Sequence, residues 1–347
     1  MRYSRVYLES LEYELPPIVV TSEELEERIA PVYKTLHIPQ GQLEALTGIT
    51  ERRFWPEGFR VSQGAVLATK KLLESACVPA KEIDTLIYAG VCRDGFEPAT
   101  ATFVASSLGL SENSLVYDIS NACLGVLNGI LDIANRIELG QSKAGLVVSC
   151  ESAREINDIT IQRLLAQPEM PLFIKSLATF TGGSGAIACL LTDGSFSPRH
   201  KPRLLGGTVF SAPQFCELCR WGMQPKGNGI FTEQMYTDSV AVLENGVKLG
   251  EKTWRKFLDS LAWSSPMVDK TICHQVGSSH RETILKTIRM EPEKDFITYP
   301  FLGNIGTVSL PITAAIAQER EFLKPQDRVA FLGIGSGLNC MMLGWEW

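Results

Sequence analysis

The sequence predicts an α/β protein built from two similar halves. Short apolar runs with the length of strands alternate with longer amphipathic runs along all 347 residues. The strand-like runs of the second half resemble those of the first in order and composition, and each half carries a Gly-Ser-Gly element followed by an apolar run. A repeat of roughly 150 to 190 residues is too long for a solenoid and fits an internally duplicated domain.

In the first half, the hydrophobic pattern predicts a helix followed by several strands. Apolar residues at helical spacing indicate an amphipathic helix from Ser62 to Ala76, and the run from Ile83 to Cys92 indicates a buried strand. Two further buried strands are expected from Ala144 to Cys150 and from Gly185 to Thr192. Between them, about residues 155–180 are mixed in composition and contain two prolines, so we interpret this segment as a helical insertion.

The second half repeats three of these elements. Residues 268–274 resemble 83–89, residues 328–332 resemble 144–148, and residues 335–343 resemble 183–191. The stretch from Asp193 to Pro202, rich in Gly, Ser and Pro, is the expected join. We therefore predict an N-terminal half over residues 1–195 and a C-terminal half over residues 196–347.

Composition excludes several classes of protein. The chain is 45% hydrophobic and 21% charged, which is ordinary for a soluble protein with a large core. A net charge of −6 without a basic stretch argues against nucleic acid as a partner. No apolar run approaches the roughly 20 residues that span a bilayer, so an integral membrane protein is not expected. The nine cysteines, an odd number lying mostly in apolar runs, favour reduced thiols in a cytoplasmic protein.

One cysteine has surroundings that are typical of a nucleophile. Cys123 follows an apolar strand-like run and precedes an apolar run at helical spacing. A cysteine on such a strand-to-helix turn lies near the unpaired N–H groups that open the helix, and the helix dipole favours its thiolate. We therefore predict that Cys123 is a nucleophile at neutral pH. The alternative is a small buried hydrophobic residue, as most cysteines are.

A nucleophilic cysteine requires a group that manages protons and donors that stabilise an oxyanion. His274 ends a predicted buried strand, where side chains of α/β proteins point into the crevice that holds their sites; its alternative is a satisfied core histidine. Asn304 is flanked by glycines and could donate a hydrogen bond to a thioester carbonyl or enolate, or could be a turn asparagine. The glycine-rich loop from Gly333 to Gly337 would let backbone N–H groups approach a ligand closely.

Taken together, these segments resemble the thiolase superfamily, and within it the β-ketoacyl-acyl carrier protein synthase III group. The segments around Cys123, His274 and Asn304 match the Cys, His and Asn of that group in order and spacing, and Thr47 to Arg53 resembles its early Thr-Gly-Ile-x-x-Arg element. The resemblance covers nearly the whole chain. It implies the thiolase-like, duplicated five-layer α-β-α-β-α fold.

Several segments are most similar to the OleA family, the condensing enzymes of bacterial long-chain olefin synthesis. They are Cys92–Ala101, Ser120–Leu124, His274–Val276, Gly303–Gly306 and Leu332–Cys340. The resemblance implies an acyltransferase that joins two fatty acyl-CoA molecules by a Claisen condensation without loss of carbon dioxide. The expected product is a 2-alkyl-3-oxoacyl compound.

The same resemblance implies roles for individual residues. Cys123 would carry the first acyl group, and the backbone N–H groups of Cys123 and Ser336 would hold the tetrahedral oxyanion. His274 and Asn304 would stabilise the enolate of the second acyl-CoA. Glu97 would reach into the partner subunit's site in a homodimer and act as the base; its alternative is an ordinary surface-loop glutamate.

No metal or other cofactor is expected beyond the coenzyme A of the thioester substrates. Cys216-x-x-Cys219 lacks a second pair with zinc-ligand spacing, so two cysteines on one helix turn is the preferred interpretation. Acyl carrier protein and downstream enzymes of olefin synthesis are the protein partners that the resemblance suggests.

One departure keeps other functions open. After His274-Gln275 a synthase III carries Ala-Asn-x-Arg, whereas this chain continues Val276-Gly277-Ser278-Ser279-His280. The alternatives are a decarboxylating synthase that uses malonyl thioesters, an acyl-CoA thioesterase, and a non-catalytic acyl-binding protein, against which the intact Cys, His and Asn set argues. Residues 155–179 and 210–235 are expected to form the walls of the acyl channel.

Overall fold

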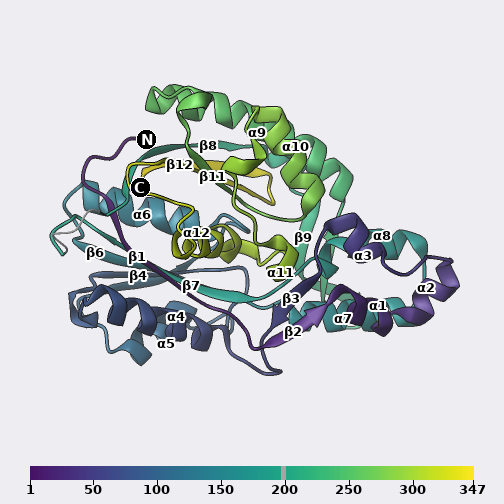
Figure 1. The fold of residues 1–347 in the computed structure, drawn as a ribbon. Coiled ribbons are helices and arrows are strands. Elements are labelled where there is room, and N and C mark those ends of the chain that lie inside the picture. The colour runs from purple at the N-terminus through teal and green to yellow at the C-terminus, as the bar shows by residue number, and fades with distance from the viewer. Residues whose placement is uncertain (197–200) are drawn as a thin grey trace.

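Five layers of helix and sheet make up the body of the protein, as the sequence resemblance predicted. The computed structural model describes residues 1–196 and 201–347. In Figure 1, helices α4 and α5 lie below one group of strands, helices α6 and α12 lie between the two groups, and helices α9 and α10 cover the second group. The chain therefore has the layer order α-β-α-β-α.

Nine strands of the described residues hydrogen-bond in series, and two separate pairs of strands lie outside them. The first half contributes the order β5-β4-β6-β7-β1, and the second half contributes β8-β13-β12-β11. The strands of the first half are β1 (Tyr7–Glu14), β4 (Thr85–Ala89), β5 (Leu115–Ile119), β6 (Ala144–Glu151) and β7 (Gly185–Thr192). Those of the second half are β8 (Arg203–Ser211), β11 (Lys270–Cys273), β12 (Arg328–Gly335) and β13 (Asn339–Glu346). The two separate pairs are β2 (Ile18–Thr21) with β3 (Glu51–Phe54), and β9 (Cys219–Gly227) with β10 (Ile230–Thr237).

The two halves repeat one arrangement of strands. Strands β4 and β6 are parallel, as are β11 and β12, and each is followed by two antiparallel neighbours. The matching strands are those that the sequence repeat pairs: β4 with β11, β6 with β12, and β7 with β13. The groups meet where Tyr7 of β1 pairs with Arg203 of β8. The expected join includes residues 197–200, which lie outside the described residues, so the boundary between residues 195 and 196 stays a prediction.

Helices cover and separate the strands. The layer helices are α4 (Val61–Ala76), α5 (Thr100–Leu108), α6 (Gly125–Glu138), α9 (Ser239–Leu261), α10 (Ser278–Ile288) and α12 (Ser309–Glu319). The others are α1 (Ser22–Arg28), α2 (Ala30–Leu36), α3 (Gln42–Thr47), α7 (Arg154–Ala166), α8 (Met170–Phe180) and α11 (Tyr299–Leu302). Short 3₁₀ turns are η1 (Ala80–Glu82), η2 (Pro213–Phe215), η3 (Ser265–Met267), η4 (Pro292–Lys294) and η5 (Gly306–Val308).

The two central helices carry the largest apolar cluster of the described residues. In α12 every residue from Ser309 to Ala317 is buried, and α6 contributes side chains such as Ile130 and Ile133. A helix that is apolar on all sides has to be covered on all sides. Burial between the two groups of strands therefore fixes where the N-terminus of each central helix lies.

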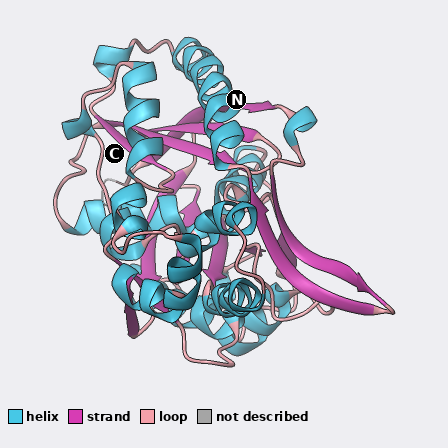
Figure 2. Ribbon diagram, turned by 90° about the vertical axis from the view of Figure 1, so that its right-hand side faces the viewer, coloured by secondary structure: helices cyan, strands magenta, loops and turns pink. Residues whose placement is uncertain are grey.

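The predicted insertion forms helices α7 and α8. They pack against α1, α2 and α3 through a separate apolar cluster that includes Leu25, Leu43, Leu164 and Phe173. The β9–β10 hairpin leaves the body of the protein beside this group and projects from it (Figure 2). The insertion and the hairpin thus lie beside the layered body rather than within it.

The boundaries of the predicted elements are close to those observed, with one exception. Helix α4 and strands β6 and β7 begin and end within one residue of the predicted positions. The strand expected from Ile83 to Cys92 is shorter and ends at Ala89. It ends early because the N–H groups of Val91 and Cys92 donate to the carboxylate of Glu151 instead of to a neighbouring strand.

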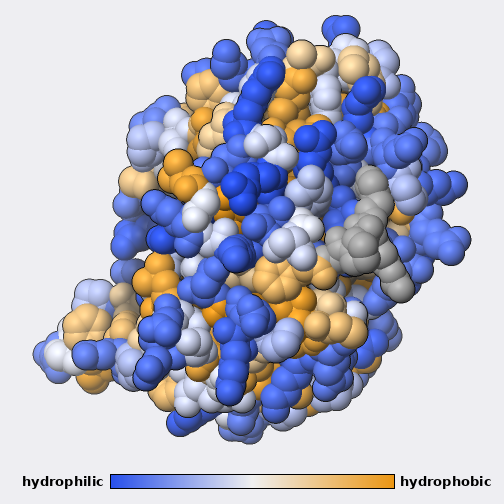
Figure 3. All heavy atoms as spheres, turned by 90° about the vertical axis from the view of Figure 1, so that its left-hand side faces the viewer, coloured by the Kyte–Doolittle hydropathy of each residue, from blue (hydrophilic) through white to orange (hydrophobic). Residues whose placement is uncertain are grey.

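One face of the protein is mainly polar. On the face drawn in Figure 3, hydrophilic side chains predominate, with apolar side chains between them. Among residues 1–196 and 201–347, none of the helices combines the length and the hydrophobicity that a membrane crossing requires.

We expect Gly129→Ala to lower the thermal stability of the protein. Alanine in place of a helical glycine normally stabilises by about 1 kcal/mol, but a Cβ on Gly129 would lie 2.6 Å from Cγ1 of Val147 in the buried strand β6. Overpacking of this kind costs about 1–3 kcal/mol. Gly246→Ala is the matched control, because its Cβ would meet only the flexible end of Ile334. Melting temperatures that rise for both variants would contradict this account of the packing.

Candidate active site

A tight, strained turn carries Cys123 between β5 and α6. The residue before it, Ala122, has a φ of 46°, in the left-handed region that costs a non-glycine residue about 1–2 kcal/mol. The turn is closed by hydrogen bonds from Leu124 N–H to Asn121 O (2.9 Å) and from Gly125 N–H to Ala122 O (3.3 Å). This geometry places Cys123 just before the N-terminus of α6, as the sequence predicted.

The protonation state predicted for Cys123 is wrong. Burial raises the pKa of its thiol to about 12, and the neighbouring Cys219 and Glu151 raise it further. The backbone N–H of Cys123 lowers the pKa but does not offset burial, and Val126 N–H at the start of α6 already donates to the Thr307 hydroxyl oxygen at 2.8 Å. The thiol is therefore protonated at neutral pH in the unliganded chain, and a role as nucleophile would require it to lose its proton.

His274 follows β11 and is the histidine of the predicted set. Its backbone N–H donates to Leu332 O at 2.8 Å, which fixes the residue at the end of the strand. Burial lowers the pKa of its imidazole to about 4, and the nearby His280 lowers it further. Its Nδ1 atom is buried and has no hydrogen-bond partner among the described residues. A neutral imidazole has one donor and one acceptor nitrogen, so His274 can both take and give a proton.

Asn304 is held so that its amide group faces outward from its own loop. Its backbone N–H donates to Thr181 O at 2.8 Å, and its Oδ1 accepts from Gly306 N–H at 3.1 Å. Because only the oxygen can accept from an N–H group, the Nδ2 group is left to donate toward the pocket. Asn304 is thus oriented as a hydrogen-bond donor.

The end of β12 and the loop that follows it bring a second backbone segment next to Cys123. A Cβ atom on Gly335 would lie only 3.3 Å from the backbone nitrogen of Cys123, so glycine permits this approach. Ser336 follows it and lines the same pocket as Cys123. The backbone N–H groups of Cys123 and Ser336 therefore belong to neighbouring turns from opposite halves of the chain.

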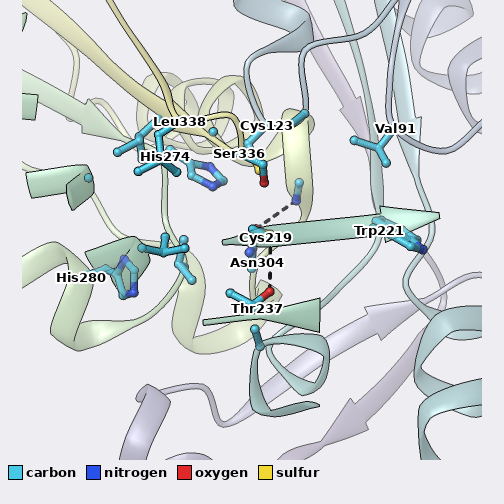
Figure 4. Close-up of a pocket in the computed structure, with 18 of the residues that line it drawn as sticks. Val91, Cys123, Cys219, Trp221, Thr237, His274, His280, Asn304, Ser336 and Leu338 are labelled. Carbon is cyan, nitrogen blue, oxygen red and sulfur yellow. Dashed lines mark hydrogen bonds between the residues drawn. The ribbon is translucent and has the colours of Figure 1, made fainter. Parts of the chain in front are cut away.

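These residues surround one cavity of about 530 Å³ (Figure 4). Cys123, His274, Asn304 and Ser336 lie on its walls, so the structure brings together four of the five residues to which the resemblance assigns roles. The rest of the lining is mostly apolar and comes from the insertion, the hairpin, α9 and β13, with residues such as Ile156, Trp221, Met235, Leu243, Val247 and Met342. The segments expected to form channel walls, 155–179 and 210–235, both contribute. The cavity therefore joins a polar reaction centre to space suited to an alkyl chain.

Glu97 does not line the cavity of its own chain. It is exposed on the loop between β4 and α5, next to Phe96, whose side chain is 99% exposed. Because both side chains face solvent, they are available for contact with the surface of another protein chain. The structure of one chain thus leaves Glu97 apart from the other four residues.

No individual role was predicted for Glu151, His280 or Cys219, which also line the pocket. Glu151 is buried at the end of β6, where its Oε1 accepts from Val91 N–H (2.9 Å) and its Oε2 from Cys92 N–H (3.1 Å). Burial raises the pKa of this carboxyl, while those N–H groups lower it. His280 of α10 and Cys219 of β9 also line the cavity. A polar residue that ends an apolar strand-like run was the available signal for Glu151.

The interpretation of Cys216 and Cys219 as one helix turn is wrong. Cys216 follows the 3₁₀ turn η2 and is exposed, whereas Cys219 begins strand β9 and lies 3.4 Å from the Thr237 hydroxyl oxygen. The two thiols therefore lie in different surroundings. Among the described residues, no group of three or more His, Cys, Asp or Glu side chains is placed to hold a metal ion.

Comparison with known proteins identifies the family. Residues 59–167 match the thiolase N-terminal domain, and residues 258–347 match the C-terminal domain of 3-oxoacyl-[acyl-carrier-protein] synthase III. The chain is 57% identical to an acyl-CoA:acyl-CoA alkyltransferase of Shewanella oneidensis and 34% identical to one of Xanthomonas campestris, in each case over 100% of both proteins. The chain belongs to the OleA family. Its resemblance to that family and to the thiolase superfamily is thereby confirmed.

Solved structures of an OleA relative share the fold. A crystal structure of Xanthomonas campestris OleA with bound cerulenin covers 100% of this chain and 98% of that one, with 34% identity and a TM-score of 0.94. A serine variant of the same protein, with bound lauric acid and lauroyl-CoA, covers 99% of this chain and 100% of its own, with 34% identity and a TM-score of 0.93. Other structures of that OleA carry substitutions of a cysteine, a glutamate and a histidine.

The raised pKa of Cys123 predicts an unusual pH dependence of its alkylation. A thiol reacts as its thiolate, and below its pKa the thiolate fraction increases about tenfold per pH unit. Without acyl-CoA, alkylation of Cys123 by iodoacetamide should therefore rise steadily from about pH 7 to pH 9, as measured by mass spectrometry of the Cys123 peptide. A plateau below about pH 8 would show a stabilised thiolate and contradict the effect of burial.

Proposed function

We propose that this chain condenses two fatty acyl-CoA thioesters, without decarboxylation, to a 2-alkyl-3-oxoacyl thioester through an acyl-Cys123 intermediate. The observation that carries the proposal is the single cavity in which Cys123, His274, Asn304 and the loop of Ser336 meet an apolar lining. The relatives named acyl-CoA:acyl-CoA alkyltransferase, and the lauroyl-CoA bound by one OleA variant, support acyl-CoA as the substrate. The enzyme is an acyltransferase, and the reaction as proposed uses no separate cofactor.

Acylation begins when the Cys123 thiol gives its proton to the neutral His274. The sulfur attacks the thioester carbonyl, and the N–H groups of Cys123 and Ser336 stabilise the oxyanion that forms. The bond from the carbonyl carbon to the coenzyme A sulfur then breaks, and His274 returns the proton to the departing coenzyme A. His274 is again neutral, which suits its depressed pKa.

Condensation requires a carbanion at the α-carbon of a second acyl-CoA. An α-proton is much less acidic than any side chain, so the enolate oxygen has to be stabilised while the base acts. The N–H donors of His274 and Asn304 supply this stabilisation. The C–C bond forms as the bond between the acyl group and Cys123 breaks, and the proton removed from the α-carbon restores the thiol.

The base in this scheme is Glu97 of the partner subunit, which makes the active unit a homodimer. Two observations support this assignment. Glu97 is exposed beside the exposed Phe96 on a loop outside its own cavity. In the crystallised OleA variants, the substituted glutamate and cysteine are separated by the same number of positions as Glu97 and Cys123.

We further propose a cytoplasmic location, which the nine free thiols of the structure support, because such thiols persist in a reducing compartment. Enzymes that consume a 2-alkyl-3-oxoacyl thioester are the expected downstream partners. A carrier protein is an alternative source of the acyl group.

The product distribution tests the reaction. Purified protein supplied with myristoyl-CoA alone should yield the condensed 2-alkyl-3-oxoacyl product and free coenzyme A, with mass spectrometry as the readout. Cys123→Ser should form neither the acyl-enzyme nor the condensed product, because an alcohol is not activated in this position. Free fatty acid as the sole product would instead identify a thioesterase, and turnover only with malonyl thioesters would identify a decarboxylating synthase.

Glu97→Ala should separate the two half-reactions. Acylation of Cys123 needs no carboxylate and should stay close to wild type, whereas condensation should fall by about 10²-fold or more, the usual contribution of a positioned general base. Coenzyme A release in a single turnover reports acylation, and the condensed product reports the second step. Glu112→Ala, an exposed loop glutamate elsewhere, is the matched control and should change neither.

Subunit mixing tests whether Glu97 acts in the partner subunit. A heterodimer of Cys123→Ser and Glu97→Ala chains contains one site with an intact Cys123 and an intact glutamate from the other chain. Mixing the two inactive variants under conditions of subunit exchange should therefore restore part of the condensation activity. An active monomer, or a mixture without activity despite exchange, would contradict the assignment.

A further inference from the structure

Three asparagines connect the two turns that carry the proposed oxyanion donors. Asn339, the first residue of β13, donates from Nδ2 to Oδ1 of Asn121 at 3.0 Å. Asn121, two residues before Cys123, donates from its own Nδ2 to Oδ1 of Asn128 at 2.7 Å. These side chains therefore form a directed series of hydrogen bonds from β13, through the nucleophile turn, to the first turns of α6.

The series spans the boundary between the two halves of the protein. Asn339 and Asn121 are 218 residues apart in the chain, yet their amide groups bond directly. Asn339 pairs with Gly335 across the β12–β13 turn, and its Nδ2 is also 3.5 Å from the carbonyl oxygen of Ser336. It thus contacts the loop of Ser336 on one side and the turn of Cys123 on the other.

The separation of the two oxyanion donors depends on this contact. One donor is on the turn of Cys123 and the other on the loop of Ser336, and no covalent connection shorter than half the chain joins them. Gly335 gives the two backbones room to approach, because its missing side chain would lie 3.3 Å from Cys123 N. A glycine permits closeness but does not fix orientation. The directed amide bonds supply the constraint that the glycine cannot.

We propose that Asn339, Asn121 and Asn128 are positioning residues that set the separation and direction of the backbone donors at Cys123 and Ser336. This inference rests on the proposed function, since it concerns the oxyanion of the acylation step. None of the three touches the reacting atoms in this account. They act by holding two donors within the roughly 0.5 Å tolerance that a catalytic site requires.

The test compares two reactions of the same sulfur. Acylation by myristoyl-CoA passes through a tetrahedral oxyanion, whereas alkylation by iodoacetamide is a direct displacement at carbon and forms none. Asn339→Leu removes the first amide bond with a side chain of similar volume and no charge. It should slow acylation of Cys123 by about tenfold or more, a fraction of the 10²–10³-fold effect of losing one donor outright, and leave alkylation nearly unchanged.

A second test variant and a control variant complete the comparison. Asn128→Leu removes the last bond of the series and should slow acylation in the same selective way, which provides the test if Asn339→Leu does not fold. Asn135→Leu is the matched control. Asn135 lies on α6, as Asn128 does, and its Oδ1 accepts from the Tyr3 hydroxyl at 2.7 Å, but it takes no part in the series. It should change neither rate.

The outcomes separate this inference from the proposed function. An unchanged acylation rate in both Asn339→Leu and Asn128→Leu would overturn the positioning role. An equal fall in acylation and alkylation would also overturn it, because it would indicate general damage to the turn. A selective fall in acylation supports it. Failure of the wild-type chain to be acylated by myristoyl-CoA would instead contradict the proposed function itself.

Discussion

The reaction centre depends on the contact between two turns that belong to opposite halves of the chain. Gly335 approaches the backbone nitrogen of Cys123, and the Thr307 hydroxyl oxygen accepts from Val126 N–H at the start of α6. Both contacts exist because α6 and α12 are buried between the same two groups of strands. The duplicated fold therefore places the proposed nucleophile on one copy and the groups proposed to stabilise its reaction on the other, and the core holds the two copies in register.

Burial of the cavity determines the protonation of both reacting groups. It raises the pKa of the Cys123 thiol and lowers that of the His274 imidazole, so both are neutral at pH 7. Charge separation between them is unfavourable until a thioester carbonyl lies between the oxyanion donors. In a site of low dielectric constant, those hydrogen bonds are stronger than in water. The geometry of the donors consequently matters more to this site than a preformed thiolate does.

The sequence predicted those parts of the site that depend on local pattern. Cys123 and His274 each follow a strand-like run, Asn304 lies in a glycine-flanked turn, and the fully buried strands are continuous apolar runs that are readily recognised. Burial was not predictable from those neighbours, because α9, the insertion and the hairpin close the cavity from distant positions. The amide series was missed for the same reason, since Asn339 and Asn121 meet only through the tertiary fold. Glu151 and Cys219 likewise enter the site through packing.

The lining of the cavity also supports the proposal that a second subunit supplies the base of the condensation. Glu151 is the one carboxylate among the described residues that line it. Both of its oxygens already accept backbone N–H groups, from Val91 and Cys92. It stabilises the turn after β4 and is poorly placed to remove an α-proton. That same turn leads directly into the exposed loop of Glu97. Glu151 therefore fixes the start of the segment that, in the proposed reaction, would carry the Glu97 carboxylate to the neighbouring chain.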